Sequence, residues 1–273
     1  MAIIAITQHI GTRADELARL VAERLGYRFL NSQMVIDEAS QRFNVTPEQL
    51  VVVDERRPHF WERLKTDTAR FIALFRAATL KFMAEDRLVI LGRSVALLMP
   101  DVGMGLKLRV VAPLNERVAA VAAEEKLAPA VAERRVRDYD REIRARLQTL
   151  FNIDIEDPLS HHLTLNTQST PIGALVAMLS AAATEIERLT PVEGRQRMRD
   201  EALAAEVRAT LMSHPKIGHA PLEVHCLGGV VRVSGPGLVP PWDDLIGGVA
   251  RNVEGVSAVQ VDAEESAAPV RPA

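Results

Sequence analysis

Hydrophobic positions near the N-terminus change from an unbroken run to helical spacing within a few residues. Residues 2–6 are apolar and rich in isoleucine, which predicts a short buried strand. Beyond Gly11, apolar side chains recur at the spacing of one helix face from Leu17 to Leu25, and Gly26 supplies a C-terminal stop. The pattern therefore predicts a strand, a tight turn and an amphipathic helix.

Short apolar runs and helical segments continue to alternate up to about residue 190. The further expected strands are 27–30, 88–91, 106–112 and 163–165. The further expected helices are 33–43, 59–84, 114–150 and 172–189. Strands that alternate with helices predict an α/β fold, in which helices flank both faces of a parallel sheet.

The pattern changes after residue 190. Residues 191–199 are polar and predict a linker between a first domain, 1–190, and an independently folding second domain, 200–264. The second domain is expected to be a small α+β unit, with helices at 201–212 and 242–252 and strands at 222–226, 230–234 and 256–261. Gly228-Gly229 predicts a hairpin between the first two strands. The tail, 265–273, is expected to be disordered.

Composition excludes several classes of function. The net charge is -3 and aromatic residues make up only 4% of the chain, so neither a basic field nor stacking surfaces favour nucleic acid as a partner. The single cysteine cannot form an internal disulfide, and His161-His162 lacks an evident third ligand, so no metal site is expected. The apolar N-terminal run is too short for a signal peptide, and a cytoplasmic protein is expected.

The turn after the first strand could hold phosphate. Gly11 permits a tight turn, Thr12 can cap the following helix, and Asp15 would complete a capping-box-like pair. Amides at a helix N-terminus attract phosphate, and Arg13 adds positive charge, but a carboxylate in the first turn competes for the same amides. The loop has no lysine and lacks the full phosphate-loop pattern. Phosphate binding and an ordinary capped turn both remain open.

Two further groups of arginines are candidates. Arg93 follows a predicted strand in VILGRS, at the sheet edge where ligands of α/β proteins bind. The alternative for Arg93 is a surface side chain. The run ERRVRDYDREIRAR, residues 133–146, interleaves arginines with acidic residues. It suits either a mobile helix that supports phosphoryl transfer or a solvated helix with internal ion pairs.

As a set, these segments resemble the cytidylate kinase-like family of nucleoside monophosphate kinases over about residues 1–190. The resemblance rests on AIIAITQHIGTRADELARLVAERLGY, VILGRS, LRVVAPLNERVAAV, RVRDYDREIRAR and LTLNTQS, in this order. It implies a P-loop fold that binds ATP with Mg²⁺, an acceptor nucleotide held by arginines, and a mobile lid. The implied contacts are ATP at Gly11, Thr12 and Arg13; the acceptor at Arg93 and Arg117; and catalytic roles in the lid for Asp140, Arg141 and Arg144.

The chain departs from the family pattern where phosphate would be bound. In the first loop only Gly11 and Glu16 match, and Asp15 replaces an arginine. Asn31-Ser32-Gln33 replaces an acidic pattern, and the lid arginine expected three residues after Asp140 falls on Ile143.

Residues 198–264 resemble a BON domain, on DEALAAEVRATLMSHP, LEVHCLGGVVRVSG and VARNVEGVSAVQV. That resemblance implies two helices on a small sheet and binding to a membrane surface or a small ligand. Two functions follow for the whole chain: ATP-dependent phosphoryl transfer to a nucleotide or similar phosphorylated acceptor, or a non-catalytic, kinase-derived regulatory protein whose BON-like domain binds a ligand, membrane surface or protein partner.

Overall fold

The computed structural model describes residues 2–54, 68–218, 220–236 and 238–264. The strands of the N-terminal part are β1 (Ile3–Gln8), β2 (Arg28–Asn31), β3 (Leu88–Gly92), β4 (Gly105–Val111) and β5 (Leu163–Asn166). They form one five-stranded sheet in the order β2-β3-β1-β4-β5, and every neighbouring pair is parallel. The predicted parallel sheet is confirmed.

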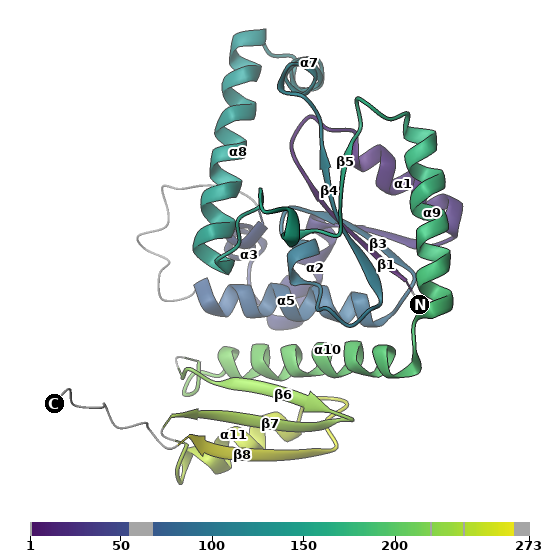
Figure 1. Ribbon diagram of the computed structural model, residues 1–273. Helices are drawn as coiled ribbons and strands as arrows, with labels where there is room; N and C mark the ends of the chain where they lie inside the picture. Colours follow the sequence, from purple (N-terminus) through teal and green to yellow (C-terminus); the bar gives the residue numbers. More distant parts are fainter. Residues whose placement is uncertain (1, 55–67, 219, 237, 265–273) are drawn as a thin grey trace, which may run out of the picture.

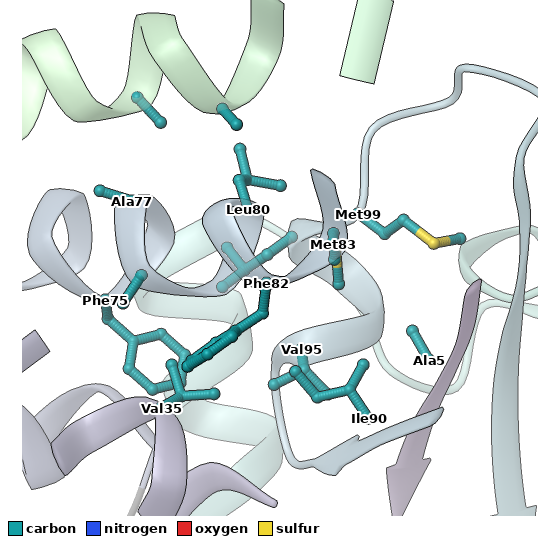
Figure 2. Packing of buried hydrophobic residues seen from close by; sticks show 14 of the residues in the cluster. Ala5, Val35, Phe75, Ala77, Leu80, Phe82, Met83, Ile90, Val95 and Met99 are labelled. Atoms are coloured by element: carbon teal, nitrogen blue, oxygen red, sulfur yellow. The ribbon is translucent and has the colours of Figure 1, made fainter. Parts of the chain in front are cut away.

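Helices cover both faces of this sheet (Figure 1). One face carries α1 (Ala14–Leu25) and α9 (Ile172–Leu189). The other carries α2 (Ser32–Phe43), α3 (Pro47–Asp54), α5 (Thr68–Ala84) and the short α6 (Val95–Leu98). Alternate side chains of β1 point to opposite faces of the sheet. Ile4 and Ile6 pack toward α1 and α9. Ile3 and Ala5 pack toward α5. Figure 2 shows the α5 side, where Phe75, Leu80 and Met83 fill the core.

Two helix predictions need correction. The stretch 114–150 is not one helix but two, α7 (Leu114–Glu125) and α8 (Pro129–Phe151). The break has a local cause, because Lys126 adopts a left-handed conformation with φ 54° and Pro129 then starts a new helix. The part 59–67 of the expected helix 59–84 lies outside the described residues, and α3 was not predicted.

The residues of the expected linker are helical. Residues 192–199 form the first turns of α10 (Val192–Ser213), which runs unbroken along α5 (Figure 1). One face of α10 belongs to the core around α5 through Met198, Ala202 and Ala209. The opposite face packs on the small C-terminal sheet through Val207 and Leu211. Polar residues in the first turns are compatible with this helix because only its buried stripes need to be apolar.

The C-terminal sheet follows the predicted order of elements. It contains β6 (Glu223–Leu227), β7 (Val230–Pro236) and β8 (Ala258–Glu264), with α11 (Trp242–Arg251) between the last two. β6 and β7 are antiparallel, β7 and β8 parallel. The hairpin at Gly228-Gly229 is confirmed, and its φ angles of 59° and 83° explain why both positions are glycine. The tail, 265–273, lies outside the described residues. In the described part of the chain, no helix combines the length and apolar character needed to cross a membrane.

Candidate functional site

The candidate site begins at the loop between β1 and α1. Gly11 has φ +75°, and a Cβ atom there would lie 2.5 Å from the backbone oxygen of Arg117. Only glycine fits this close approach without strain. Helix α1 starts at Ala14, and no side chain caps its N-terminus. The loop therefore keeps the tight turn and the helix terminus that phosphate-binding loops use.

The expected capping box is wrong. The Thr12 hydroxyl donates to the carbonyl of His9 at 2.8 Å and closes the turn on itself. Asp15 accepts from Arg19 Nε at 2.7 Å, one helical turn further on, and both side chains are exposed. Asp15 is thus paired along the outer surface of α1, and its carboxylate does not bind the amides at the start of the helix.

This geometry predicts a small effect of Asp15→Asn. The substitution removes an exposed i,i+4 ion pair and a first-turn carboxylate, each worth no more than about 1 kcal/mol. We expect nucleotide affinity, measured by calorimetry, to change less than about threefold, a shift of about 0.6 kcal/mol. A gain of tenfold or more would show that Asp15 does repel the ligand.

Arg13 is also turned away from the loop. Its guanidinium binds Glu16 through two hydrogen bonds of 2.7 Å, and the Arg13 side chain is 56% exposed. The hydrogen bonds that Arg13 donates to Glu16 raise the pKa of Arg13 and lower the pKa of Glu16. The structure thus places Arg13, the expected phosphate contact, in a surface pair at the start of α1.

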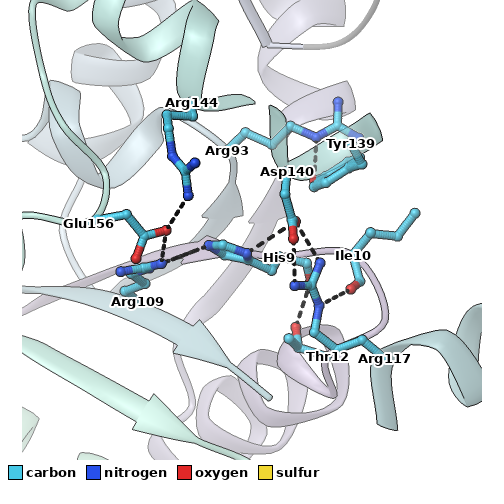
Figure 3. Close-up of polar contacts among 10 residues, drawn as sticks. All are labelled: His9, Ile10, Thr12, Arg93, Arg109, Arg117, Tyr139, Asp140, Arg144 and Glu156. Carbon is cyan, nitrogen blue, oxygen red and sulfur yellow. Dashed lines mark hydrogen bonds and ion pairs between the residues drawn. The ribbon is translucent and has the colours of Figure 1, made fainter. Parts of the chain in front are cut away.

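The centre of the site is the pair between the buried Arg117 of α7 and the partly buried Asp140 of α8 (Figure 3). Arg117 is 5% exposed and binds both carboxylate oxygens of Asp140, at 2.9 and 2.6 Å. Its Nε donates to the carbonyl of Ile10 at 2.8 Å. The side chain of Arg117 thus connects three elements through its three hydrogen bonds. It holds α7 and α8 against the loop between β1 and α1.

A second chain of contacts extends from Asp140 across the sheet edge. His9 Nδ1 lies 3.3 Å from Asp140, and its Nε2 lies 3.2 Å from Arg109 of β4. Arg109 pairs with Glu156 at 2.8 Å, and Arg144 of α8 reaches the same carboxylate at 3.2 Å. Since arginine can only donate, Nε2 of His9 accepts and Nδ1 carries the proton that faces Asp140.

The acidic members of this network are held ionised. Burial alone would raise the pKa of Asp140, but the hydrogen bonds from His9 and Arg117 outweigh it and lower the pKa to about 2. Burial likewise opposes ionisation of Glu156, and Arg109 and Arg144 reverse the effect and lower its pKa. At neutral pH both carboxylates are therefore ionised, and they are shared by three guanidinium groups, those of Arg117, Arg109 and Arg144.

Arg93 lies at the carboxyl edge of the sheet, as predicted. Its Nε donates to the Tyr139 hydroxyl at 2.6 Å, and the guanidinium stacks 4.7 Å from the centre of that ring. Arg141 does not join the site. It is exposed on α8 and pairs with Asp138, which is the solvated-helix alternative for this part of the charged run.

The sequence prediction missed four residues that the structure adds to the site: His9, Arg109, Tyr139 and Glu156. Arg109 had a usable signal, because it is a polar residue between the buried Leu108 and Val110, near the carboxyl end of an expected strand. His9 lies beside the loop, and a single histidine gives no sequence pattern that marks it as part of a site. Glu156 lies in the segment between α8 and η2 (Pro158–Ser160), where the sequence has no periodicity to place it.

Comparisons with known proteins agree with this architecture. The chain is 29% identical over 163 residues to a cytidylate kinase from Desulfurococcus amylolyticus, covering 58% of this chain and 80% of that one. It is 23% identical over 192 residues to a cytidylate kinase from Thermococcus kodakarensis, covering 69% and 90%. A solved structure of an uncharacterised protein from Eubacterium ventriosum superposes with a TM-score of 0.53 at 13% identity, over 67% of this chain and 98% of that one, which shows a shared fold. Residues 3–169 match the family described as the cytidylate kinase-like family. The chain belongs to that family.

Proposed function

We propose that this chain is a non-catalytic, kinase-derived regulatory protein that binds a nucleotide or another small phosphorylated ligand at the edge of its parallel sheet. One observation carries the proposal. Arg13 is the only arginine or lysine between Gln8 and Glu16, and it is bound to Glu16 at the surface. The loop therefore directs no cation toward a bound phosphate chain, although phosphoryl transfer depends on such charge.

The remaining basic side chains of the site support the same conclusion. Arg117 is bound to Asp140, and Arg109 and Arg144 are both bound to Glu156. A phosphate that needed these guanidinium groups would have to displace carboxylates of the chain itself. This competition lowers affinity for triphosphate and disfavours assembly of a transfer-competent site.

The residues of the loop do not fit Mg-ATP. A phosphate loop uses a lysine on the phosphates and an adjacent hydroxyl on the metal. Here the loop has no lysine that could hold the phosphates. The proposal accordingly contains no chemical step through ATP or Mg²⁺.

The second candidate function is ATP-dependent phosphoryl transfer to a nucleotide. The observation that favours it is the turn at Gly11 followed by the uncapped N-terminus of α1, which leaves amides for an anion. In that case Arg93 and Arg117 would hold the acceptor, and the pair between Arg117 and Asp140 would have to open.

The small C-terminal sheet would provide the regulatory output. We propose that residues 200–264 form a BON-like unit that binds a partner or a membrane surface. Its support is the order of elements from α10 to β8, with a glycine hairpin between β6 and β7. Because α10 belongs to both cores, a ligand at one part can influence the other through a shared helix.

Calorimetric titration with CMP, CDP and ATP, each with and without Mg²⁺, tests the proposal. We expect at least one nucleotide to bind, and Arg93→Ala to weaken it by about tenfold or more, equivalent to about 1.4 kcal/mol. Arg134→Ala is the matched control, because Arg134 lies on the outer surface of α8 with 85% of its side chain exposed. Absence of binding to every nucleotide at millimolar concentration would contradict the ligand-binding part of the proposal.

A further inference from the structure

A groove lies where the α/β part meets the small sheet. It has a volume of about 560 Å³, within the range typical of ligand sites, and lies among α5, α10 and β6. Its helical walls are formed largely by small side chains, Ala69 and Ala73 from α5 and Ala204 and Ala205 from α10. Small walls leave room for larger apolar side chains of a bound molecule.

The third wall is the edge of a strand. In the described sheet β6 pairs only with β7, and three consecutive residues, Val224, His225 and Cys226, line the groove. Consecutive side chains of a strand point to opposite faces. A groove that touches all three therefore runs along the backbone edge of β6, which Figure 1 shows as the strand of the small sheet nearest α10.

The register of the hairpin shows which backbone groups face outward. Gly228-Gly229 is a two-residue turn, and Leu227 and Val230 form its closing pair. The two residues of such a closing pair are hydrogen-bonded to each other. Further along the antiparallel strands, pairs without and with hydrogen bonds then alternate. His225 therefore bonds to β7, whereas Val224 and Cys226 direct their N–H and C=O groups away from it.

The charge at the rim favours an acidic partner. Arg76 of α5, Arg208 of α10 and His225 line the groove together with one acidic residue, Glu201. Glu201 pairs with Arg76 at 3.4 Å, and Arg208 is exposed at the other end of the α10 wall. Two arginines against one carboxylate leave an excess of positive charge.

We propose that this groove binds an extended acidic segment of a protein partner, which adds as a strand beside β6. Backbone groups of the segment would pair with Val224 and Cys226, which is the recognition mode of strand addition. Alternate apolar side chains would pack on the alanine walls, and acidic side chains would face Arg208. The inference deepens the proposed function by naming a partner class for the C-terminal unit, and it does not depend on nucleotide binding.

The test uses fluorescence anisotropy with labelled seven-residue peptides of alternating glutamate and valine, and of alternating lysine and valine, in the absence of nucleotide. We expect the glutamate peptide to bind at least about tenfold more tightly, a difference of about 1.4 kcal/mol. Arg208→Glu should remove this preference, whereas Arg197→Glu, an exposed position of α10 outside the groove, should retain it. Val224→Pro removes an outward N–H and should abolish binding, whereas Val224→Ala should not.

If Val224→Pro fails to fold, amide hydrogen exchange of the unaltered chain, measured with and without peptide, shows whether the peptide binds at β6. Bound glutamate peptide should slow exchange of the amides of Val224 and Cys226. Equal binding of the two peptides, no binding at millimolar concentration, or protection at other strands would overturn the proposal. A concentration-dependent dimer that Val224→Pro abolishes would also overturn it, because the edge would then serve a second copy of this chain. Since nucleotide is absent, none of these results depends on the nucleotide site.

Discussion

Truncation of the chain after Leu189 is expected to unfold the remaining α/β part. The cut removes α10, whose residues Met198, Ala202 and Ala209 complete the core that contains Leu74 and Leu80 of α5. Removing one buried methionine side chain alone costs about 2–5 kcal/mol. Loss of the whole helix face should therefore remove most of the free energy of unfolding, which is about 5–15 kcal/mol for a typical protein.

Circular dichroism with thermal and urea unfolding measures this effect. The full chain should unfold in one cooperative transition, and the fragment 1–189 should lack one or aggregate. Met198→Ala should lower the free energy of unfolding by about 2–5 kcal/mol. Arg197→Ala, its exposed neighbour, should change it by less than about 0.5 kcal/mol. A stable fragment with the unfolding midpoint of the full chain would restore the expectation of two independent domains.

Arg117→Ala is expected to have the largest effect of any single substitution at the site. Arg117 is 5% exposed, and its loss leaves the Asp140 carboxylate beside His9 without its bidentate partner. Removing one member of a buried pair costs about 3–5 kcal/mol. Asp140 retains some contact with solvent, so we expect a loss of about 3 kcal/mol in urea unfolding.

The pH dependence of stability provides the control for this substitution. The pKa of Asp140 in the folded chain is about 2, below its ordinary value of 3.8. A depressed carboxyl pKa stabilises the fold above the ordinary value, and this contribution is lost as pH falls from about 4 toward 2. Arg117→Ala should flatten stability over that interval, and Arg134→Ala should leave it unchanged. Equal pH profiles for all three proteins would contradict the assigned pair.

The parallel sheet could be predicted because two neighbouring strands, β1 and β3, are short, continuous apolar runs at residues 2–6 and 88–91. The role of α10, which belongs to both cores, could not be predicted in this way. Its apolar residues lie on two faces, one for each core, so no single stripe marks the start of the helix at Val192. The polar residues of that first stretch resemble those of a linker for the same reason.

The site was predicted only in part because its chemistry depends on pairs distant in sequence. Positions such as Gly11 and Arg93 follow from strand ends, which the sequence shows. The partners of Arg117 and Arg109 cannot be read from strand ends, because α8 and the segment after it bring Asp140 and Glu156 to them. Thr12 and Asp15 were misassigned because a local capping pattern cannot reveal that His9 and Arg19 compete for the same side chains.

We propose that the loop from His9 to Arg13 does not support phosphoryl transfer. An acid-quenched assay with Mg-ATP labelled in the γ-phosphate, and CMP as acceptor, tests it most directly. We expect no labelled CDP above the enzyme-free background, because Arg13 is bound to Glu16 and Arg117 to Asp140. Repeated turnover at about 1–100 per second, the ordinary range of kinases, would show that the chain is an active kinase.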